Sequence, residues 1–369
     1  MSAILNIAIL GCGRVAGHHI RAINSNPQLK LSALSDLNLD RCLKMPGAGS
    51  VPHYANYHEM LQNHPEIDVV SIITPSGMHF EHAMDVIQTY NKSLVIEKPV
   101  VMRILDGEIL AQTALAQGVK VFPVHQYRFN RCVQRIRHAV MDKELGNIVL
   151  ATVRMRWCRP QHYYDRDPWR GTFALDGGCC TNQGIHHLDL LRYLAGEVKR
   201  VNAIMRTIGS NIEVEDTAVV TLEFKSGALG VFEITTAARP NDFESSFSIV
   251  GDKGLAMLGG WATDKLITFS PKPEEEAIYS DSFEDAYGYG HNEIYGGVYN
   301  ALVHGGQAAV ELDDAQHTIQ LLHAIYLSAE RQSWVDVAHG EESALLGKPD
   351  DALASLYRTL DQSTTIYSK

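Results

Sequence analysis

Short apolar runs alternate with stretches of helical length over the first 123 or so residues, and this alternation constrains the fold more than any other feature of the chain. The runs are nearly continuous in apolar residues, which is typical of parallel strands that helices cover on both faces. We therefore predict a doubly wound α/β domain with right-handed crossovers. The predicted strands are Leu5–Leu10, Lys30–Ser35, Asp68–Ile73, Ser93–Ile96 and Val119–Val124, and two of the predicted helices are His79–Tyr90 and Ile104–Gln117.

A glycine-rich turn joins the first predicted strand to the first helix. It reads Gly-Cys-Gly-Arg-Val-Ala over residues 11–16, a pattern whose glycines let the backbone approach a pyrophosphate at the helix N-terminus. Asp36 ends the second strand, where its carboxylate would accept hydrogen bonds from the adenosine ribose and repel a 2′-phosphate. The pattern favours NAD over NADP, and the alternative is a glycine turn that holds no cofactor.

The pattern changes after about residue 124. In residues 217–224, the side chains from Ala218 to Phe224 alternate between an apolar and a polar face, as in a strand with one buried face. We predict a mostly antiparallel open sheet with one uncovered, half-apolar face, and hence a homodimer or homotetramer joined through it. The other predicted strands and helices of this part are Ile148–Trp157, Ala228–Thr236, Ser245–Val250 and Lys265–Phe269, and Asn130–Asp142, Gly184–Leu194 and Asp313–Ser328.

The 369 residues are too many for one ordinary core, so we divide the chain where the pattern changes. Residues 1–123 are predicted as a NAD-binding Rossmann domain and residues 124–334 as an α/β domain for substrate binding and oligomerisation. Residues 335–369 are predicted as a polar extension, ordered only through Ala352–Leu360. Ser270–Asp285 is predicted as an acidic loop.

Composition excludes two classes of partner. The formal net charge of −11 disfavours a surface that follows nucleic-acid phosphates, and no apolar run approaches the roughly 18 residues of a membrane helix. The apolar N-terminus lacks the basic region of a signal peptide. Because no two of the six cysteines have C-x-x-C spacing, we expect free thiols and a soluble, cytoplasmic protein.

Two polar segments follow predicted parallel strands, at the edge where such sheets bind ligands. One is Thr-Pro-Ser-Gly-Met-His over residues 74–79, and the other is Glu97-Lys98-Pro99, whose lysine could donate to a substrate hydroxyl. Read in isolation, the first is an ordinary turn and Lys98 a solvated lysine. The predicted cofactor-binding residues are Gly11, Gly13, Arg14, Val15, Asp36, Thr74, Pro75, Ser76, His79, Glu97, Lys98 and Gln126.

Asp176–Asp189 is the segment richest in chemistry. Its glycines indicate that backbone approaches a ligand closely, and the spacing of Asn182 and His186 places them on one face of a helix start. Asp189 could orient the imidazole of His186, which would accept a proton while Lys98 holds the same oxygen. The alternative is a structural histidine in the core. We predict no metal, because adjacent histidines point apart and no second ligand pair has suitable spacing.

These motifs, in this order, resemble the glucose–fructose oxidoreductase/inositol dehydrogenase (Gfo/Idh/MocA) family over roughly residues 3–332. The resemblance implies a Rossmann domain, a C-terminal open sheet that joins dimers or tetramers, and hydride exchange between a sugar or cyclitol carbon and nicotinamide. It places Lys98 and His186 at catalytic positions. Many members have Asp where this chain has Asn182. Since asparagine carries no charge, His186 is the stronger candidate base, with Asn182 as the third predicted catalytic residue.

Residues 157–164, 169–172 and 211–217 are similar to the branch of that family that oxidises C3 of UDP-N-acetylglucosaminuronic acid for surface polysaccharide. Arginine forks can meet diphosphate or carboxylate and aromatic rings can stack on a ligand, although sheet packing is an equal alternative for the rings. The branch implies NAD recycled in place by 2-oxoglutarate. The predicted substrate-binding residues are Arg128, Arg159, Tyr163, Tyr164, Trp169, Arg170, Asn182 and His186. A dehydrogenase of a free cyclitol or sugar (myo-inositol or glucose type) and a catalytically idle NAD-binding regulatory protein stay open.

Overall fold

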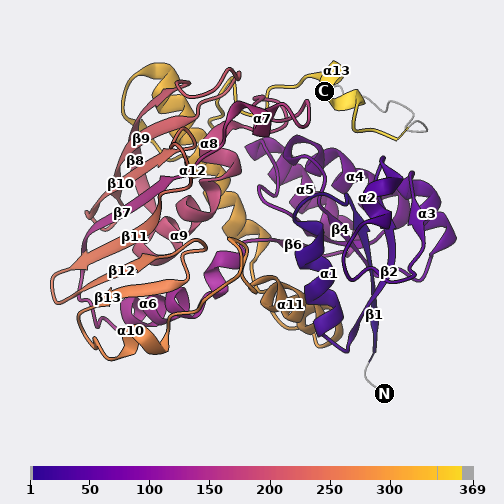
Figure 1. The fold of residues 1–369 in the computed structure, drawn as a ribbon, viewed down its shortest axis with the longest axis horizontal. Helices are drawn as coiled ribbons and strands as arrows, with labels where there is room; N and C mark the ends of the chain where they lie inside the picture. The colour runs from indigo at the N-terminus through magenta and orange to yellow at the C-terminus, as the bar shows by residue number, and fades with distance from the viewer. Residues whose placement is uncertain (1–2, 339, 360–369) are drawn as a thin grey trace.

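The computed structural model describes residues 3–338 and 340–359, which form two sheets with their covering helices (Figure 1). The first sheet has six parallel strands in the order β3-β2-β1-β4-β5-β6. This confirms the predicted doubly wound domain, whose strand order reverses next to β1, the position where such sheets bind ligands. Its strands are β1 (Leu5–Leu10), β2 (Leu29–Ser35), β3 (His53–Tyr54), β4 (Val69–Ile72), β5 (Ser93–Ile96) and β6 (Val121–Pro123). Its helices are α1 (Ala16–Ser25), α2 (Leu39–Leu43), α3 (Tyr57–Asn63), α4 (His79–Tyr90) and α5 (Ile104–Gln117).

The second sheet has eight strands in the order β13-β12-β11-β7-β10-β9-β8-β14. Only the β10–β7 pair is parallel among its described pairs, so the predicted mostly antiparallel sheet is confirmed. Its strands are β7 (Ile148–Arg156), β8 (Val198–Arg206), β9 (Thr217–Phe224), β10 (Leu229–Thr235), β11 (Glu244–Gly251), β12 (Leu255–Gly259), β13 (Lys265–Phe269) and β14 (Val335–Asp336). The predictions missed β8, β12 and β14.

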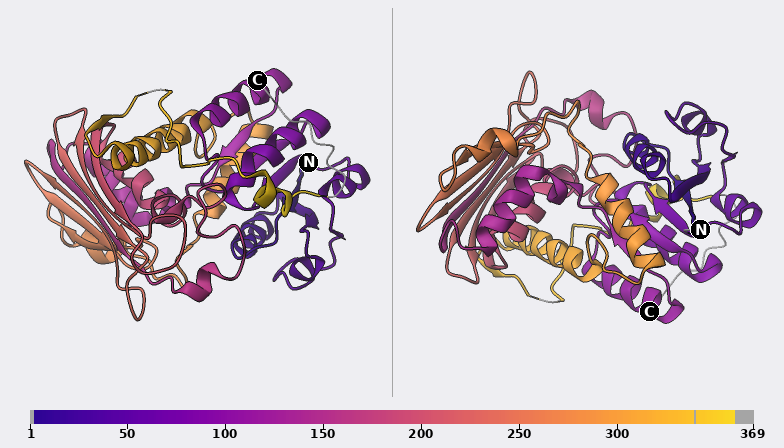
Figure 2. Two further views of the ribbon diagram at one scale, coloured as in Figure 1. Left: turned by 90° about the horizontal axis from the view of Figure 1, so that it is seen from above. Right: turned by 90° about the horizontal axis from the view of Figure 1, so that it is seen from below.

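Helices cover one face of the second sheet and leave the other bare (Figures 1 and 2). The covering helices are α6 (Arg131–Met141), α9 (Ile185–Ala195) and α12 (Leu312–Arg331). The even-numbered side chains of β9, from Ala218 to Phe224, are buried as predicted, whereas Val219 is 47% exposed. Ile204 and Leu229 of the neighbouring strands are also exposed. The bare face therefore carries apolar side chains.

Two later segments return to the first domain. Helix α11 (His291–Val303), which we did not predict, packs on α1 and adds Ile294, Tyr295 and Val298 to the core of the first sheet. The last described helix, α13 (Asp351–Ser355), overlaps the predicted Ala352–Leu360 region and starts one residue before it. Leu360 lies outside the described residues. The predicted domain boundaries at residues 123 and 334 stay a proposal. Residues of α11, which lie in the second predicted domain, contribute to the core of the first sheet.

Three short helices lie in the connections. They are α7 (Gln161–Tyr164), α8 (Gly178–Asn182) and α10 (Glu275–Ile278). Helix α10 lies within the segment that we predicted as an acidic loop. Within the described ranges, no helix combines the length and the apolar character needed to cross a bilayer.

Candidate active site

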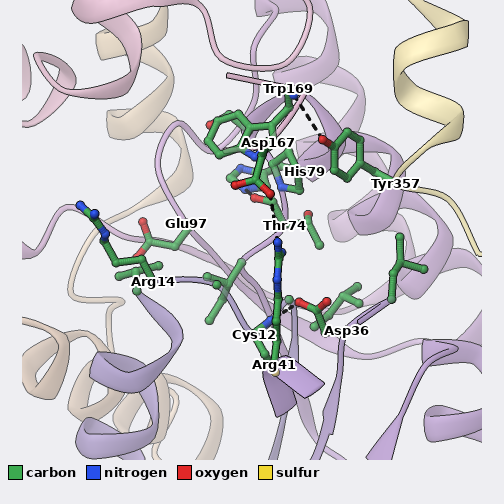
Figure 3. Close-up of a pocket in the computed structure, with 18 of the residues that line it drawn as sticks. Cys12, Arg14, Asp36, Arg41, Thr74, His79, Glu97, Asp167, Trp169 and Tyr357 are labelled. Carbon is green, nitrogen blue, oxygen red and sulfur yellow. Dashed lines mark hydrogen bonds and ion pairs between the residues drawn. The ribbon is translucent and has the colours of Figure 1, made fainter. Parts of the chain in front are cut away.

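A cavity of about 710 Å³ opens at the carboxyl ends of the strands of the first sheet (Figure 3). All twelve predicted cofactor-binding residues line this cavity. Five of the predicted substrate-binding residues also line it, namely Tyr163, Trp169, Arg170, Asn182 and His186. The first domain therefore supplies one side of the cavity, and the second domain supplies much of the other.

The glycine turn forms an open cradle in the cavity wall. Gly11 has φ +99°, and a Cβ there would lie 2.6 Å from the carbonyl oxygen of Ile73, so only glycine fits. Among the described residues, and apart from its chain neighbours, no atom lies within 4 Å of the corresponding Cβ position at Gly13. Helix α1 begins after Val15 without a side-chain cap and without an acidic residue in its first turn. The turn and the helix N-terminus therefore fit a pyrophosphate.

The carboxylate of Asp36 is held in the cavity wall by two backbone N–H groups. Cys12 donates to Oδ2 at 2.8 Å and Asn38 donates to Oδ1 at 2.8 Å. These bonds fix the carboxylate beside the glycine turn, in the position that recognises an adenosine ribose. Arg41, from α2 beyond Asp36, reaches across the cavity to Asp167 of the second domain, at 3.0 Å.

Lys98 connects the two domains at the other end of the cavity. Its Nζ donates to the main-chain oxygen of Asn182 at 2.7 Å and to the side-chain Oδ1 at 3.2 Å. Burial lowers the pKa of Lys98, while the negative charges of Glu97 and Asp176 oppose that shift. The ammonium is thus placed in the cavity with a donor available to a ligand oxygen.

Glu97, which precedes this lysine in the chain, forms hydrogen bonds with two buried histidines. Oε1 accepts from Nε2 of His19 at 2.9 Å and from Nε2 of His291 at 3.3 Å. Burial raises the pKa of Glu97, but these hydrogen bonds outweigh it and hold the pKa well below its usual value. The three side chains are close enough to share a metal ion. Their donor atoms already bond to one another, which explains the grouping without an ion.

His186 lies in the cavity wall with its ring stacked on Tyr127, at a centroid distance of 4.7 Å. Its Nδ1 is buried without a hydrogen-bond partner. Burial, reinforced by the charge of Lys98, lowers the pKa of His186 well below its usual value. A neutral imidazole beside an ammonium group can accept a proton at neutral pH.

The predicted contact between Asp189 and His186 is wrong. Asp189 instead accepts two hydrogen bonds from Arg128, at 2.6 and 2.7 Å, and lies 3.6 Å from His125. The guanidinium is the stronger partner for a buried carboxylate because it offers a charged fork. Asn182 and His186 also do not share one helix, since α8 ends at Asn182 and α9 starts at Ile185.

Asp176 fixes the amide of Asn182, a role that the sequence reading did not assign. Its Oδ1 accepts from Nδ2 of Asn182, and its Oδ2 accepts from the N–H of Gly171 at 2.6 Å. Nδ2 is thereby turned toward the carboxylate, and Oδ1 is left to accept from Lys98. The sequence signal was an acidic residue at the start of the glycine run.

Arg170 is the predicted arginine that reaches the cavity. Its Nη1 donates to the hydroxyl of Tyr163 at 2.7 Å, and its guanidinium lies 4.5 Å from the ring centroids of both Tyr163 and Trp169. Asp167 is 3.5 Å from its Nε. Cation–π contacts with both rings restrict the direction of the guanidinium fork.

Three other predicted substrate-binding residues are not part of the cavity lining. Arg128 forms ion pairs with Asp189 and Asp314, and Arg159 forms one with Asp242 at 2.9 Å. The hydroxyl of Tyr164 is buried against Thr236, 3.0 Å from its Oγ1. These side chains have partners that come from distant parts of the chain, and their role in substrate binding stays a prediction.

Several lining residues escaped the sequence reading. Tyr287 lines the cavity and packs on His18, at a centroid distance of 4.3 Å. Arg41, Asp167 and Tyr357 line it as well. They belong to a short helix, to loops and to the C-terminal extension, where no periodic pattern signals a ligand site.

Family models match both domains. The model described as "Oxidoreductase family, NAD-binding Rossmann fold" matches residues 5–125, and the GFO/IDH/MocA C-terminal domain matches residues 133–257. The chain belongs to the Gfo/Idh/MocA family of oxidoreductases. It is an NAD-dependent dehydrogenase acting on CH–OH groups, and the alternative of an idle NAD-binding protein has no support.

Two solved structures resemble this family member over nearly its whole length. The WlbA dehydrogenase of Bordetella pertussis, in complex with NADH and UDP-GlcNAcA, is 31% identical, with a TM-score of 0.85, over 91% of this chain and 98% of its own. The WlbA dehydrogenase of Chromobacterium violaceum, with the same ligands, is 30% identical, with a TM-score of 0.84, over 92% of this chain and 97% of its own. Myo-inositol 2-dehydrogenase of Thermotoga maritima is 24% identical over 89% of this chain and 97% of its own length.

Proposed function

We propose that this dehydrogenase oxidises C3 of UDP-N-acetylglucosaminuronic acid, in nucleotide-sugar metabolism for surface polysaccharide. The observation that carries the proposal is the charge of the cavity. Among the described residues, its lining has five Arg or Lys and three Asp or Glu side chains, in a chain whose formal net charge is −11. A positive cavity in an acidic protein suits a ligand with several negative charges, such as a nucleotide diphosphate joined to a uronic acid. The ligands of the two WlbA structures agree with this reading.

In this proposal Arg170 binds the diphosphate or the carboxylate of the sugar nucleotide, and the rings of Tyr163 and Trp169 hold its guanidinium in place. Lys98 donates a hydrogen bond to the C3 hydroxyl, and neutral His186 accepts its proton. Asn182 directs the lysine through Oδ1. NAD, held by the glycine turn and Asp36, would supply the hydride acceptor for this oxidation.

The cofactor would be restored in place by 2-oxoglutarate, which accepts the hydride in a second half-reaction. A small dicarboxylate suits the same basic cavity after the sugar has left. We place both half-reactions in the cytoplasm, since all six cysteines are free thiols.

The test is a substrate panel with the purified protein. UDP-N-acetylglucosaminuronic acid, UDP-N-acetylglucosamine, myo-inositol and glucose are compared by NADH absorbance, each with and without 2-oxoglutarate. We expect the highest kcat/KM for the uronate, and Arg170→Lys should raise its KM because one ammonium cannot replace a planar fork. Faster turnover of myo-inositol or glucose would refute the nucleotide-sugar proposal and favour the free-polyol alternative.

We further propose that two copies of the chain pair through the bare face of the second sheet, as a homodimer or within a homotetramer. Val219 and Leu229 lie on this face, 47% and 58% exposed, on strands that pair with each other. A half-apolar sheet face of this kind is stabilised when a second copy covers its exposed apolar side chains.

A further inference from the structure

The segment that follows β14 crosses from the second domain to the first. We call residues 341–359 the C-terminal strap. At its start, the side chain of Leu346 is only 2% exposed in the core of the second domain, and the N–H of Gly347 donates to the carbonyl of Phe173 at 2.9 Å. Figures 1 and 2 show the strap leaving this domain and ending, with α13, over the helices of the first.

An arginine fork ties the far end of the strap to the first domain. Nε and Nη2 of Arg358 donate to the two carboxylate oxygens of Glu81, on α4, at 2.7 and 2.9 Å. Nη1 donates to Asp351 within the strap at 2.6 Å. A bidentate pair of this kind fixes orientation as well as distance. Arg358 itself is not part of the cavity lining.

The residues next to this arginine reach the cavity. Tyr357, half-buried, and Thr359, buried, line it, and the hydroxyl of Tyr357 accepts from the N–H of Trp169 at 3.2 Å. Figure 3 shows Tyr357 and Trp169 together on one side of the cavity, with Asp36 and Cys12 on the other. Since the carboxylate after the second strand marks the adenosine end of a dinucleotide site, the strap lies over that end.

We propose that the C-terminal strap is part of the NAD site, with Tyr357 packed against the adenosine half of the cofactor and the Arg358–Glu81 ion pair holding it there. The cofactor then leaves only when the strap lifts from α4. An aromatic side chain provides a face for adenine and loses little conformational freedom when it is ordered. This inference rests on NAD binding and is independent of which sugar the enzyme oxidises.

The test measures NADH release from the full-length protein by stopped-flow fluorescence, with excess NAD as the displacing ligand. Tyr357→Ala and Arg358→Ala should each raise the dissociation rate, by about tenfold and about threefold. Tyr357→Phe keeps the ring and should stay close to wild type. The matched control is Arg131→Ala, which removes another arginine–carboxylate pair, to Asp281 at 3.3 Å, outside both the strap and the cavity lining. Its rate should equal that of wild type.

Competition separates contact with adenosine from a general loosening of the fold. Tyr357→Ala should weaken the binding of ADP-ribose as much as the binding of NADH, whereas nicotinamide mononucleotide should bind with unchanged affinity. The charge exchange of Glu81→Arg with Arg358→Glu should restore slow release, because the pair is rebuilt in reverse. The proposal would be overturned by wild-type release rates in both alanine variants, or by equally weakened binding of ADP-ribose and nicotinamide mononucleotide. Circular dichroism and urea midpoints establish that each variant is folded.

Discussion

Replacing Asn182 by Asp gives this chain the carboxylate that many relatives are expected to carry at this position, and here we expect it to destabilise the fold. Nδ2 of Asn182 donates to the carboxylate of Asp176, which is only 1% exposed. The substitution would put two carboxylates in contact, and burial already raises the pKa of Asp176. One of the pair must then hold a proton.

The loss of folding free energy depends on the pH, because the proton must be taken up from solution at that pH. An unfolded Asp has a pKa of about 3.9, so keeping one proton on the pair costs about 4 kcal/mol at pH 7 and about 1.5 kcal/mol at pH 5. The folded pKa is raised above the unfolded value, so stability is lost as the pH rises. The Lys98 ammonium, whose Nζ is 3.2 Å from Oδ1 of Asn182, offsets part of this cost. We therefore expect Asn182→Asp to lose about 2–4 kcal/mol at pH 7.

Urea denaturation of the single and double variants at pH 5 and pH 7 measures this effect. Adding Asp176→Asn to Asn182→Asp restores one amide and one carboxylate, since the new amide can accept from Gly171 and donate to the side chain at position 182. The double variant should recover most of the lost stability, with a coupling energy above about 1.5 kcal/mol. Additive effects of the two substitutions, or an equal loss at both pH values, would refute the reasoning.

Three further changes test other parts of the structure. His186→Asn should lower kcat by about 10²–10⁴-fold at nearly constant KM. Because burial and the charge of Lys98 hold the pKa of His186 well below 6.5, the kcat/KM of the wild type should stay constant from pH 8 to pH 6.5. A titration midpoint of kcat/KM above pH 6.5 would argue against His186 as the base. Burial raises the pKa of Glu215 from 4.5 to about 7, so the stability of the wild type should fall by up to about 3 kcal/mol between pH 4.5 and 7, and Glu215→Gln should abolish this slope in urea titrations. Val219→Glu should dissociate the proposed oligomer in sedimentation experiments, and an unchanged mass would place the interface elsewhere.

The dinucleotide domain was predictable because its signals are local. Strands β1 and β5 have the predicted bounds, since continuous apolar runs between turns describe buried parallel strands directly. The glycine turn is an equally local signal, because its pattern occupies residues 11–16 directly after β1. Such constraints are written in a few consecutive residues.

Elements with mixed signals were missed. Helix α11 contains Gly296 and Gly297, which lower helix propensity, yet a Cβ at Gly297 would lie 2.7 Å from Ala309. That glycine is required by a close contact that only the fold reveals. Strand β8 starts with an irregular register between Val198 and Arg200, and this breaks the alternation that would have identified it.

Substrate recognition depends on which charged side chains lack a full ion-pair partner in the folded protein. The sequence alone does not show which side chains these are. Arg128 and Arg159 have the same side-chain chemistry as Arg170, but each forms ion pairs with carboxylates that lie 61 to 186 residues away. Arg170 instead shares Asp167 with Arg41, so two guanidinium groups face one carboxylate in the cavity. An arginine recognises an anionic ligand only where positive charge remains in excess, and that balance is a property of tertiary contacts. The cofactor-binding residues were predictable from sequence motifs in turns. The substrate-binding arginines depend on ion-pair partners that only the folded chain reveals.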